Sequence, residues 1–165
     1  MTDDSEDSRQ LKTLPKWRSR IFHSYFLLSR PMTFGVRGIV YDPNVESVFL
    51  IRHTYVAGWH FPGGGVERGE TAVQALRREL REEGNIEISA APELKSLHLN
   101  RRASPRDHVA LYLVTGFRQT TPRKPNFEIA ESGFFKMNDL PAGTTPATLR
   151  RLDEVFHGKT PSDYW

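Results

Sequence analysis

Residues 64–86 read GGVERGETAVQALRRELREEGNI and carry the strongest structural pattern in this 165-residue chain. From Glu70 to Glu83, apolar residues recur at the spacing of an amphipathic helix. Three carboxylates, Glu79, Glu82 and Glu83, stand at positions i, i+3 and i+4, so they share one quadrant of that helix. Like charges at this spacing repel each other unless something neutralises them. The pattern predicts a helix with a concentrated acidic patch.

A glycine-rich loop precedes this helix, because residues 61–65 read Phe-Pro-Gly-Gly-Gly. Glycine permits positive φ angles and a close backbone approach, so the loop can present a carbonyl or an amide to a metal ion or a phosphate. Hard divalent cations bind several oxygen ligands on a rigid support. The alternative is a solvated charged face in which Arg78 pairs with Glu82. The acidic patch beside the loop favours a metal site over that alternative.

The composition limits the classes of protein to consider. With 38% hydrophobic residues, the chain can bury one ordinary core, so we expect a single domain over residues 11–165 behind a flexible acidic leader, residues 1–10. The absence of cysteine excludes disulfides, thiolate zinc sites and cysteine nucleophiles. A net charge of +3, mixed along the chain, is weak support for nucleic-acid binding. With no apolar run of membrane-spanning length and a polar N-terminus, a cytoplasmic location is expected.

Other elements are expected on both sides of the acidic helix. Period-two patterns predict five strands, over residues 34–41, 47–51, 94–99, 109–116 and 132–137. The first two form a hairpin around Asp42-Pro43-Asn44, and a last helix covers residues 146–156. A basic amphipathic helix over residues 17–29 is expected to cover the domain's own flank, with a homodimer contact or a membrane surface as alternatives. The sum is an α/β (α+β) fold, a mixed sheet flanked by helices.

Residues 64–86 resemble the Nudix box, which reads Gly, five residues, Glu, seven residues, Arg-Glu-aliphatic, one residue, Glu-Glu, one residue, Gly, aliphatic. The resemblance extends over about residues 32–156, since Phe61–Gly64 and Phe134–Pro141 also match the family. It implies a Nudix-type α/β/α sandwich with a mixed sheet, to which the N-terminal helix is an addition. Asn85 replaces the family's glycine at a helix end, where a left-handed residue is required and Asn is the next most tolerant choice.

The resemblance also implies roles for particular residues. The metal ligands would be Glu79, Glu82, Glu83 and the Gly63 carbonyl, and the metal Mg²⁺, with Mn²⁺ as an alternative. Glu70 and Arg78 would form a supporting ion pair between the loop and the helix. The catalytic base would be one of three residues: Glu82, Glu79 or Glu128. For Glu128, a solvated glutamate near a strand start is the alternative interpretation.

The substrate is less constrained by the sequence. Arg52 and His53 are candidate phosphate contacts, although Arg52 also suits an exposed strand end. Trp59 either stacks a base or packs the loop, and Gly64 and Gly65 would contact the substrate through their backbone. We expect hydrolysis of a nucleoside diphosphate linked to another moiety, or of a nucleoside triphosphate, by a monomer or homodimer. The alternatives are an RNA 5′-end pyrophosphohydrolase and a non-catalytic Nudix-fold nucleotide-binding module.

Overall fold

Two central strands are buried on both faces, and this property determines the layers of the fold. In the computed structural model, which describes residues 32–165, β1 is Thr33–Asp42 and β2 is Ser47–His53. Phe49 and Ile51 of β2 point to one face of the sheet, whereas Val48 and Leu50 point to the other. A strand that is apolar on both sides needs a covering layer on each face.

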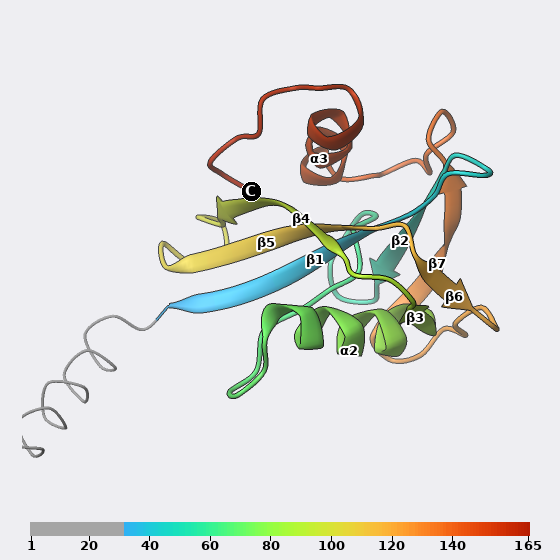
Figure 1. The fold of residues 1–165 in the computed structure, drawn as a ribbon, viewed down its shortest axis with the longest axis horizontal. Helices are drawn as coiled ribbons and strands as arrows, with labels where there is room; N and C mark the ends of the chain where they lie inside the picture. The colour runs from blue at the N-terminus through green and yellow to red at the C-terminus, as the bar shows by residue number, and fades with distance from the viewer. Residues whose placement is uncertain (1–31) are drawn as a thin grey trace, which may run out of the picture. The chain divides into compact units, whose positions relative to one another are not determined.

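Two helices supply these layers. Helix α2 is Ala72–Gly84 and α3 is Pro146–Phe156, and they lie on opposite faces of the sheet (Figure 1). Leu76 and Leu80 of α2 pack in one core cluster with Phe49 and Ile51, and Leu152 of α3 packs in the other with Leu50. The expected α/β/α sandwich is confirmed. Within residues 32–165, no helix has the length and hydropathy to cross a membrane.

The sheet has five strands in the order β4-β5-β1-β2-β7 and is mixed. β1 and β5 run parallel, and the other neighbours are antiparallel. The three outer members are β4 Glu93–Leu99, β5 Asp107–Val114 and β7 Ile129–Lys136. A separate two-stranded sheet joins β3, Ile86–Ile88, to β6, Phe117–Gln119. The sequence patterns missed β3 and β6, because three-residue strands are too short to show a period.

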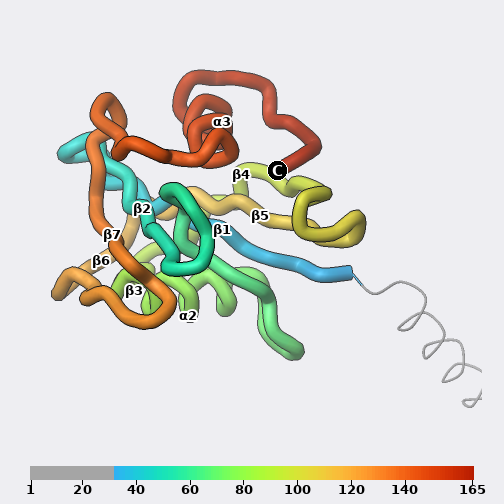
Figure 2. The backbone as a smooth tube through the Cα atoms, turned by 180° about the vertical axis from the view of Figure 1, so that it is seen from behind, coloured from blue at the N-terminus to red at the C-terminus, as the bar shows by residue number. Residues whose placement is uncertain are grey.

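The expected hairpin of β1 and β2 is closed only at its turn. The two strands pair at two positions, Tyr41 with Val48 and Asp42 with Ser47, and then separate. The segment that follows β2 turns back beside it (Figure 2), and His60 exchanges two backbone hydrogen bonds of 2.9 Å with Ile51. The chain then continues along β1. Three backbone hydrogen bonds join it there: Val36 N to Gly64 O at 2.9 Å, Gly38 N to Pro62 O at 2.9 Å and Val66 N to Phe34 O at 2.8 Å.

Residues 59–66 therefore form an irregular strand inserted between β1 and β2. We call this segment the inserted strand. Its glycine-rich part is fixed by the hydrogen bonds of Pro62, Gly64 and Val66 to β1, along the edge that β2 leaves unpaired beyond the hairpin turn. The glycine loop predicted from the sequence is thus part of the sheet.

The predicted boundaries hold to within a few residues, with small corrections. The acidic helix was expected from Glu70, but it begins after Thr71, whose hydroxyl accepts from Gln74 N while the Gln74 side chain accepts from Thr71 N. This capping box ends the loop and starts the helix. At the other end Asn85 adopts φ 52°, ψ 36°, which confirms the expected left-handed residue. The leader over residues 1–10 and the helix over residues 17–29 lie outside the described residues.

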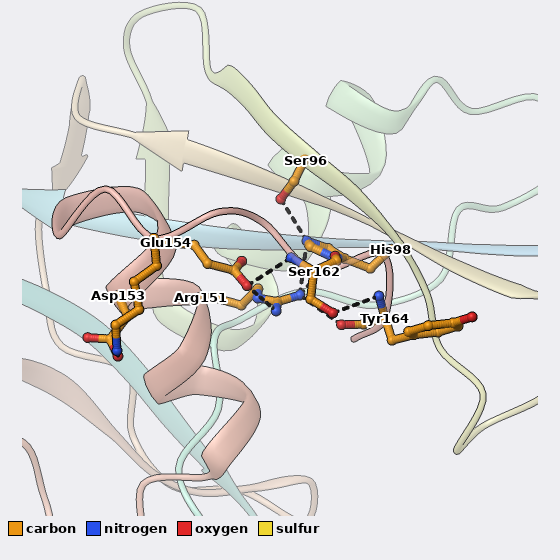
Figure 3. Close-up of polar contacts among 8 residues, drawn as sticks. Ser96, His98, Arg151, Asp153, Glu154, Ser162 and Tyr164 are labelled. Atoms are coloured by element: carbon orange, nitrogen blue, oxygen red, sulfur yellow. Dashed lines mark hydrogen bonds and ion pairs between the residues drawn. The ribbon is translucent and has the colours of Figure 1, made fainter.

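A buried arginine connects α3 to the C-terminal segment. Arg151 is fully buried, and its guanidinium donates to Glu154 Oε1 at 2.6 Å and to the Tyr164 carbonyl at 3.2 Å (Figure 3). His98 of β4 lies against it, within hydrogen-bonding distance of the Ser162 carbonyl at 2.6 Å. The segment also pairs with the free edge of β4, since Leu99 N donates to Asp163 O at 2.8 Å. The segment covers a sheet edge that would otherwise be open for pairing.

Arg151→Ala should destabilise the protein by about 3–5 kcal/mol, because it leaves the Glu154 carboxylate buried without its partner. Urea denaturation followed by circular dichroism measures this change. Arg150→Ala is the matched control, since Arg150 is exposed on the same helix, and it should alter stability by less than about 0.5 kcal/mol. Equal stability of the two variants would contradict the role given to Arg151.

Candidate active site

The three glutamates of the acidic patch occupy different environments at the C-terminal half of α2. The Glu83 side chain is 5% exposed, that of Glu79 is 13% exposed and that of Glu82 is 60% exposed. Arg78 contacts two of them, with Nη1 2.7 Å from Glu79 Oε1 and 3.6 Å from Glu82 Oε2. Solvent exposure in the patch therefore increases from Glu83, which is buried, to Glu82, which is exposed.

Glu83 is held by the backbone of the inserted strand. The Gly63 amide donates to Glu83 Oε2 at 2.7 Å. Gly63 has φ 138°, and a Cβ at this position would lie 2.1 Å from the Val36 carbonyl oxygen of β1. Only glycine fits here, both for its conformation and for the space available. The amide that orients the buried carboxylate therefore depends on the close contact between the inserted strand and β1.

The next glycine makes room for Glu79. A Cβ built on Gly64 would lie 2.3 Å from Glu79 Oε1, so the carboxylate occupies the space of the missing side chain. The adjacent Gly65 has open space at the same position. Gly64 is thus a second position, after Gly63, at which the loop and the acidic helix come into direct contact.

Arg78 ties the loop to the helix. Its guanidinium bonds both oxygens of Glu70, with Nε to Oε1 at 2.9 Å and Nη2 to Oε2 at 3.1 Å, and Nη2 also donates to the Gly65 carbonyl at 3.0 Å. The ion pair between Glu70 and Arg78 that the sequence predicts is present. The hydrogen bonds from Arg78 lower the pKa of Glu70, and those to Glu70 raise the pKa of Arg78. Such a two-bond pair fixes orientation as well as distance.

Burial disfavours the ionised form of the inner carboxylates. It raises the pKa of Glu83 to about 8, against the lowering effects of the Gly63 amide and of the Arg37 charge. Burial also raises the pKa of Glu79, although the hydrogen bond from Arg78 acts in the opposite direction. Neighbouring carboxylates, including Glu128 near Glu83, add to the rise. The charges of Arg37 and Arg78 do not offset the effect of burial, and a dication would supply further positive charge.

His53 and Glu128 converge on Glu83. One ligand atom from each of the three residues lies within 4.8 Å of the other two. Glu128 precedes β7, so the structure brings this sequence-predicted acid to the buried end of the acidic patch. Burial lowers the pKa of His53, and the charge of Arg37 acts in the same direction.

Arg52 and His53 point to opposite faces of the sheet, as adjacent strand residues do. Arg52 pairs with Glu131 at 2.9 Å and lies 5.8 Å from the Trp59 ring centroid, so it is held away from Glu83. Trp59 is buried under α3 and packs edge-on against Phe135, with ring centroids 4.7 Å apart. This placement favours the packing interpretation of Trp59 over base stacking.

The sequence patterns missed Arg37. Its charge acts on Glu79, Glu83 and His53, and its buried Nη1 has no hydrogen-bond partner within residues 32–165. The signal was visible, since Arg37 is the one charged residue in the apolar stretch Phe34–Val40. A charge inside an apolar strand needs a partner or a function.

A cleft of about 260 Å³ borders the glycine loop. Its lining includes Arg37, Gly64 and Gly65 from the site, together with Asn100 and Asp107. A larger hollow of about 390 Å³ lies at the hairpin turn and the end of α3, and it contains none of the predicted site residues. The smaller cleft is the better candidate for substrate, because it adjoins the carboxylates.

The donor set suits magnesium. The acidic patch offers carboxylate oxygens on a helix, and the inserted strand offers backbone carbonyls beside them. Mg²⁺ prefers oxygen ligands and retains several waters, so a partly open site with Glu82 at its exposed side accommodates it.

Comparison with known proteins gives relatives that are named RNA pyrophosphohydrolase. The RNA pyrophosphohydrolase of Helicobacter pylori strain G27 is 46% identical over 52 residues, which are 29% of this chain and 34% of that protein. That of Legionella pneumophila strain Corby is 43% identical over 56 residues, 31% of this chain and 32% of that protein. The matches therefore span about a third of the length of these relatives.

Solved structures match a larger part of the chain. A crystal structure of a MutT Nudix hydrolase from Burkholderia pseudomallei covers 76% of this chain and 98% of its own, with a TM-score of 0.64 and 24% identity. A MutT structure from work on Aliivibrio salmonicida and Vibrio cholerae covers 72% and 93%, with a TM-score of 0.55 and 26% identity. The family model of the NUDIX domain matches residues 31–156. This chain belongs to the Nudix hydrolase family.

Proposed function

We propose that the chain is a Mg²⁺-dependent pyrophosphohydrolase for nucleoside diphosphates linked to another moiety, or for nucleoside triphosphates. One observation carries the proposal: the inserted strand lies directly against the acidic face of α2, with Gly63 bonded to Glu83 and Gly64 in contact with Glu79. A rigid backbone beside converging carboxylates is the arrangement that phosphoryl chemistry with a hard cation needs.

Glu79, Glu82 and Glu83 would hold the metal, together with the Gly63 carbonyl. The carbonyls on either side, those of Pro62 and Gly64, are already bonded to β1, which supports giving the intervening carbonyl to the metal. When bound, Mg²⁺ neutralises charge on phosphoryl oxygens and lowers the pKa of a coordinated water. Arg78, paired with Glu70, keeps the loop and the helix in register.

Glu82 is our proposed general base, with Glu79 and Glu128 as alternatives. Glu82 is the most exposed of the three patch carboxylates, and its distance of 3.6 Å from Arg78 is longer than a hydrogen bond. Burial raises the pKa of Glu79, but one of its carboxylate oxygens already accepts a hydrogen bond from Arg78 at 2.7 Å. A proton taken from an attacking water at Glu82 passes directly to solvent.

For the substrate, the cleft beside Gly64 and Gly65 supports contact through the loop backbone. His53 and Arg52 were the predicted phosphate contacts. Of these, His53 lies nearer the acidic patch, whereas Arg52 must leave Glu131 to reach a phosphate. Trp59 is buried, and its proposed role is to stabilise the loop by packing in the core rather than to bind substrate. A small-molecule nucleotide is the proposed partner class.

A second candidate function is hydrolysis of triphosphorylated RNA 5′ ends. The observation in its favour is the local identity to RNA pyrophosphohydrolases, which covers about a third of their length. The complete set of box glutamates argues against the non-catalytic alternative. A Mg²⁺-dependent screen of nucleotide sugars, dinucleotides, nucleoside triphosphates and triphosphorylated RNA, with phosphate products quantified, separates the candidates. We expect a small molecule to be turned over faster than RNA, and the opposite order would establish the second candidate.

Glu82→Gln should lower kcat by roughly 100-fold or more, because it removes a ligand charge and the proposed base without changing side-chain shape. Because Glu82 is exposed, the melting temperature should stay the same. Glu87→Gln is the matched control, since Glu87 is an exposed glutamate paired with Arg118, and it should keep wild-type turnover. Full activity of Glu82→Gln at saturating Mg²⁺ would remove Glu82 from the site.

Gly64→Ala should weaken Mg²⁺ binding by about 10-fold or more while the protein stays folded. The added methyl group displaces the Glu79 carboxylate, whose flexible end can move at little cost to stability. Gly133→Ala is the control, because its new Cβ meets only ordinary contacts at 3.8 Å or more. Magnesium titrations of turnover, with circular dichroism as a check on folding, make the comparison. An unchanged Mg²⁺ requirement in Gly64→Ala would contradict the contact.

The stabilisation by Mg²⁺ should grow with pH. Without metal, the pKa of Glu83 is about 8 in the folded chain against an ordinary value of 4.5. The folded state therefore binds the extra proton, and its stability falls as pH rises from about 4.5 through 8. Magnesium requires the ionised form and restores this loss. Melting temperatures should rise more with Mg²⁺ at pH 8.5 than at pH 6, and Glu83→Gln should flatten the difference. Equal shifts at both pH values would count against the raised pKa.

A further inference from the structure

His53 is a buried imidazole with an unused nitrogen beside the acidic patch. Its side chain is 10% exposed, and its Nε2 lies 3.9 Å from Glu83 Oε1. The other ring nitrogen, Nδ1, is buried and makes no well-formed hydrogen bond within residues 32–165, although the Glu128 backbone interacts with the ring. Buried polar atoms are normally bonded, so this one calls for an explanation.

A β-bulge brings His53 into the neighbourhood of Glu128. The register between β2 and β7 shifts after Arg52, which pairs with Glu131, so that His53 pairs with Ile129. Ala130 is the extra residue of β7. Bulges at strand ends re-aim side chains and are frequent beside functional sites.

Backbone contacts then hold the main chain of Glu128, and its carboxylate also acts on the nearby Tyr55 hydroxyl. Thr54 N donates to the Glu128 carbonyl at 2.9 Å, and Glu128 N donates to Asn126 Oδ1 at 2.9 Å. The two carboxylate oxygens of Glu83 have different neighbours. Oε2 accepts a hydrogen bond from the Gly63 amide, and Oε1 lies near the His53 ring. Each residue of the cluster is thus positioned by bonds that leave a ligand atom available.

The distances fit one shared cation after small side-chain rotations. Two ligands that each lie about 2.1 Å from an ion are at most about 4.2 Å apart. The 3.9 Å between His53 and Glu83 is within that limit, and the full cluster spans 4.8 Å. An imidazole nitrogen is a ligand that first-row transition metals accept and that Mg²⁺ does not favour.

We infer that His53, Glu83 and Glu128 form a cation site with one nitrogen ligand, which takes a transition-metal dication such as Mn²⁺ in preference to Mg²⁺. The inference deepens the proposed function and rests on it through Glu83, which the acidic patch shares. It gives His53 a metal-binding role in place of the phosphate contact expected from the sequence. The site is separate from Glu82, which lies at the exposed end of the patch.

Pulsed electron paramagnetic resonance of Mn²⁺ bound to the full chain tests the site. We expect nuclear modulation from a directly bonded ¹⁴N in the wild type and its loss in His53→Gln. His60→Gln is the matched control, since the His60 ring lies 6.0 Å from that of His53 and its Nε2 is already bonded to the Ala57 carbonyl at 3.0 Å. That variant should retain the modulation.

Affinities give a second measurement. The preference for Mn²⁺ over Mg²⁺ should fall by about 10-fold or more in His53→Gln, and Glu128→Gln should weaken Mn²⁺ binding by a similar factor. Absence of ¹⁴N modulation in the wild type, whatever the variants do, overturns the site. Failure of the proposed function has a different signature, because a wild type that shows the nitrogen signal but hydrolyses no nucleotide keeps the site and loses the reaction.

Discussion

The insertion of residues 59–66 between β1 and β2 is the constraint on which the rest of the molecule depends. Without it, the two strands would continue as an ordinary hairpin and the glycines would lie in solvent. With it, the inserted strand is bonded to Val36 and Gly38 on one side and to Ile51 on the other. Helix α2 then packs on a surface whose backbone is fixed at both edges. The site inherits its rigidity from the sheet.

The site concentrates negative charge where little positive charge is present. Glu83 is buried, Glu79 nearly so, and Arg78 is committed to Glu70 as well as to Glu79. Arg37 is the remaining cation that acts on the inner carboxylates. Burying like charges together lowers the stability of the folded state. Protonation of one of the carboxylates reduces this cost. The raised pKa of Glu83 favours the neutral acid in the chain without metal, and under the proposed function a bound dication would favour the carboxylate.

The sequence predicted the parts of the molecule that repeat a pattern over several residues. The acidic helix, the five principal strands and the last helix follow from periodicity, and Asn85 follows from the chemistry of helix ends. What it could not give are properties of packing between distant segments. The inserted strand, the burial of Glu83 and the β-bulge at His53 depend on contacts across 20 or more residues. Local patterns contain no information about such contacts. Alternation along a strand predicts that Arg52 and His53 face opposite sides, but it does not say which side carries the site.

The inserted strand positions the carboxylates through backbone atoms. Positioning of the carboxylates and recognition of the substrate can therefore change independently during evolution. The amide of Gly63 and the space above Gly64 do not depend on the identity of neighbouring side chains. The outer walls of the adjoining cleft, around Asn100 and Asp107, come from a different part of the chain. Substitutions there can alter which molecule is recognised while the hydrolytic centre stays in place, so new specificities can arise by drift in a loop without passing through an inactive protein.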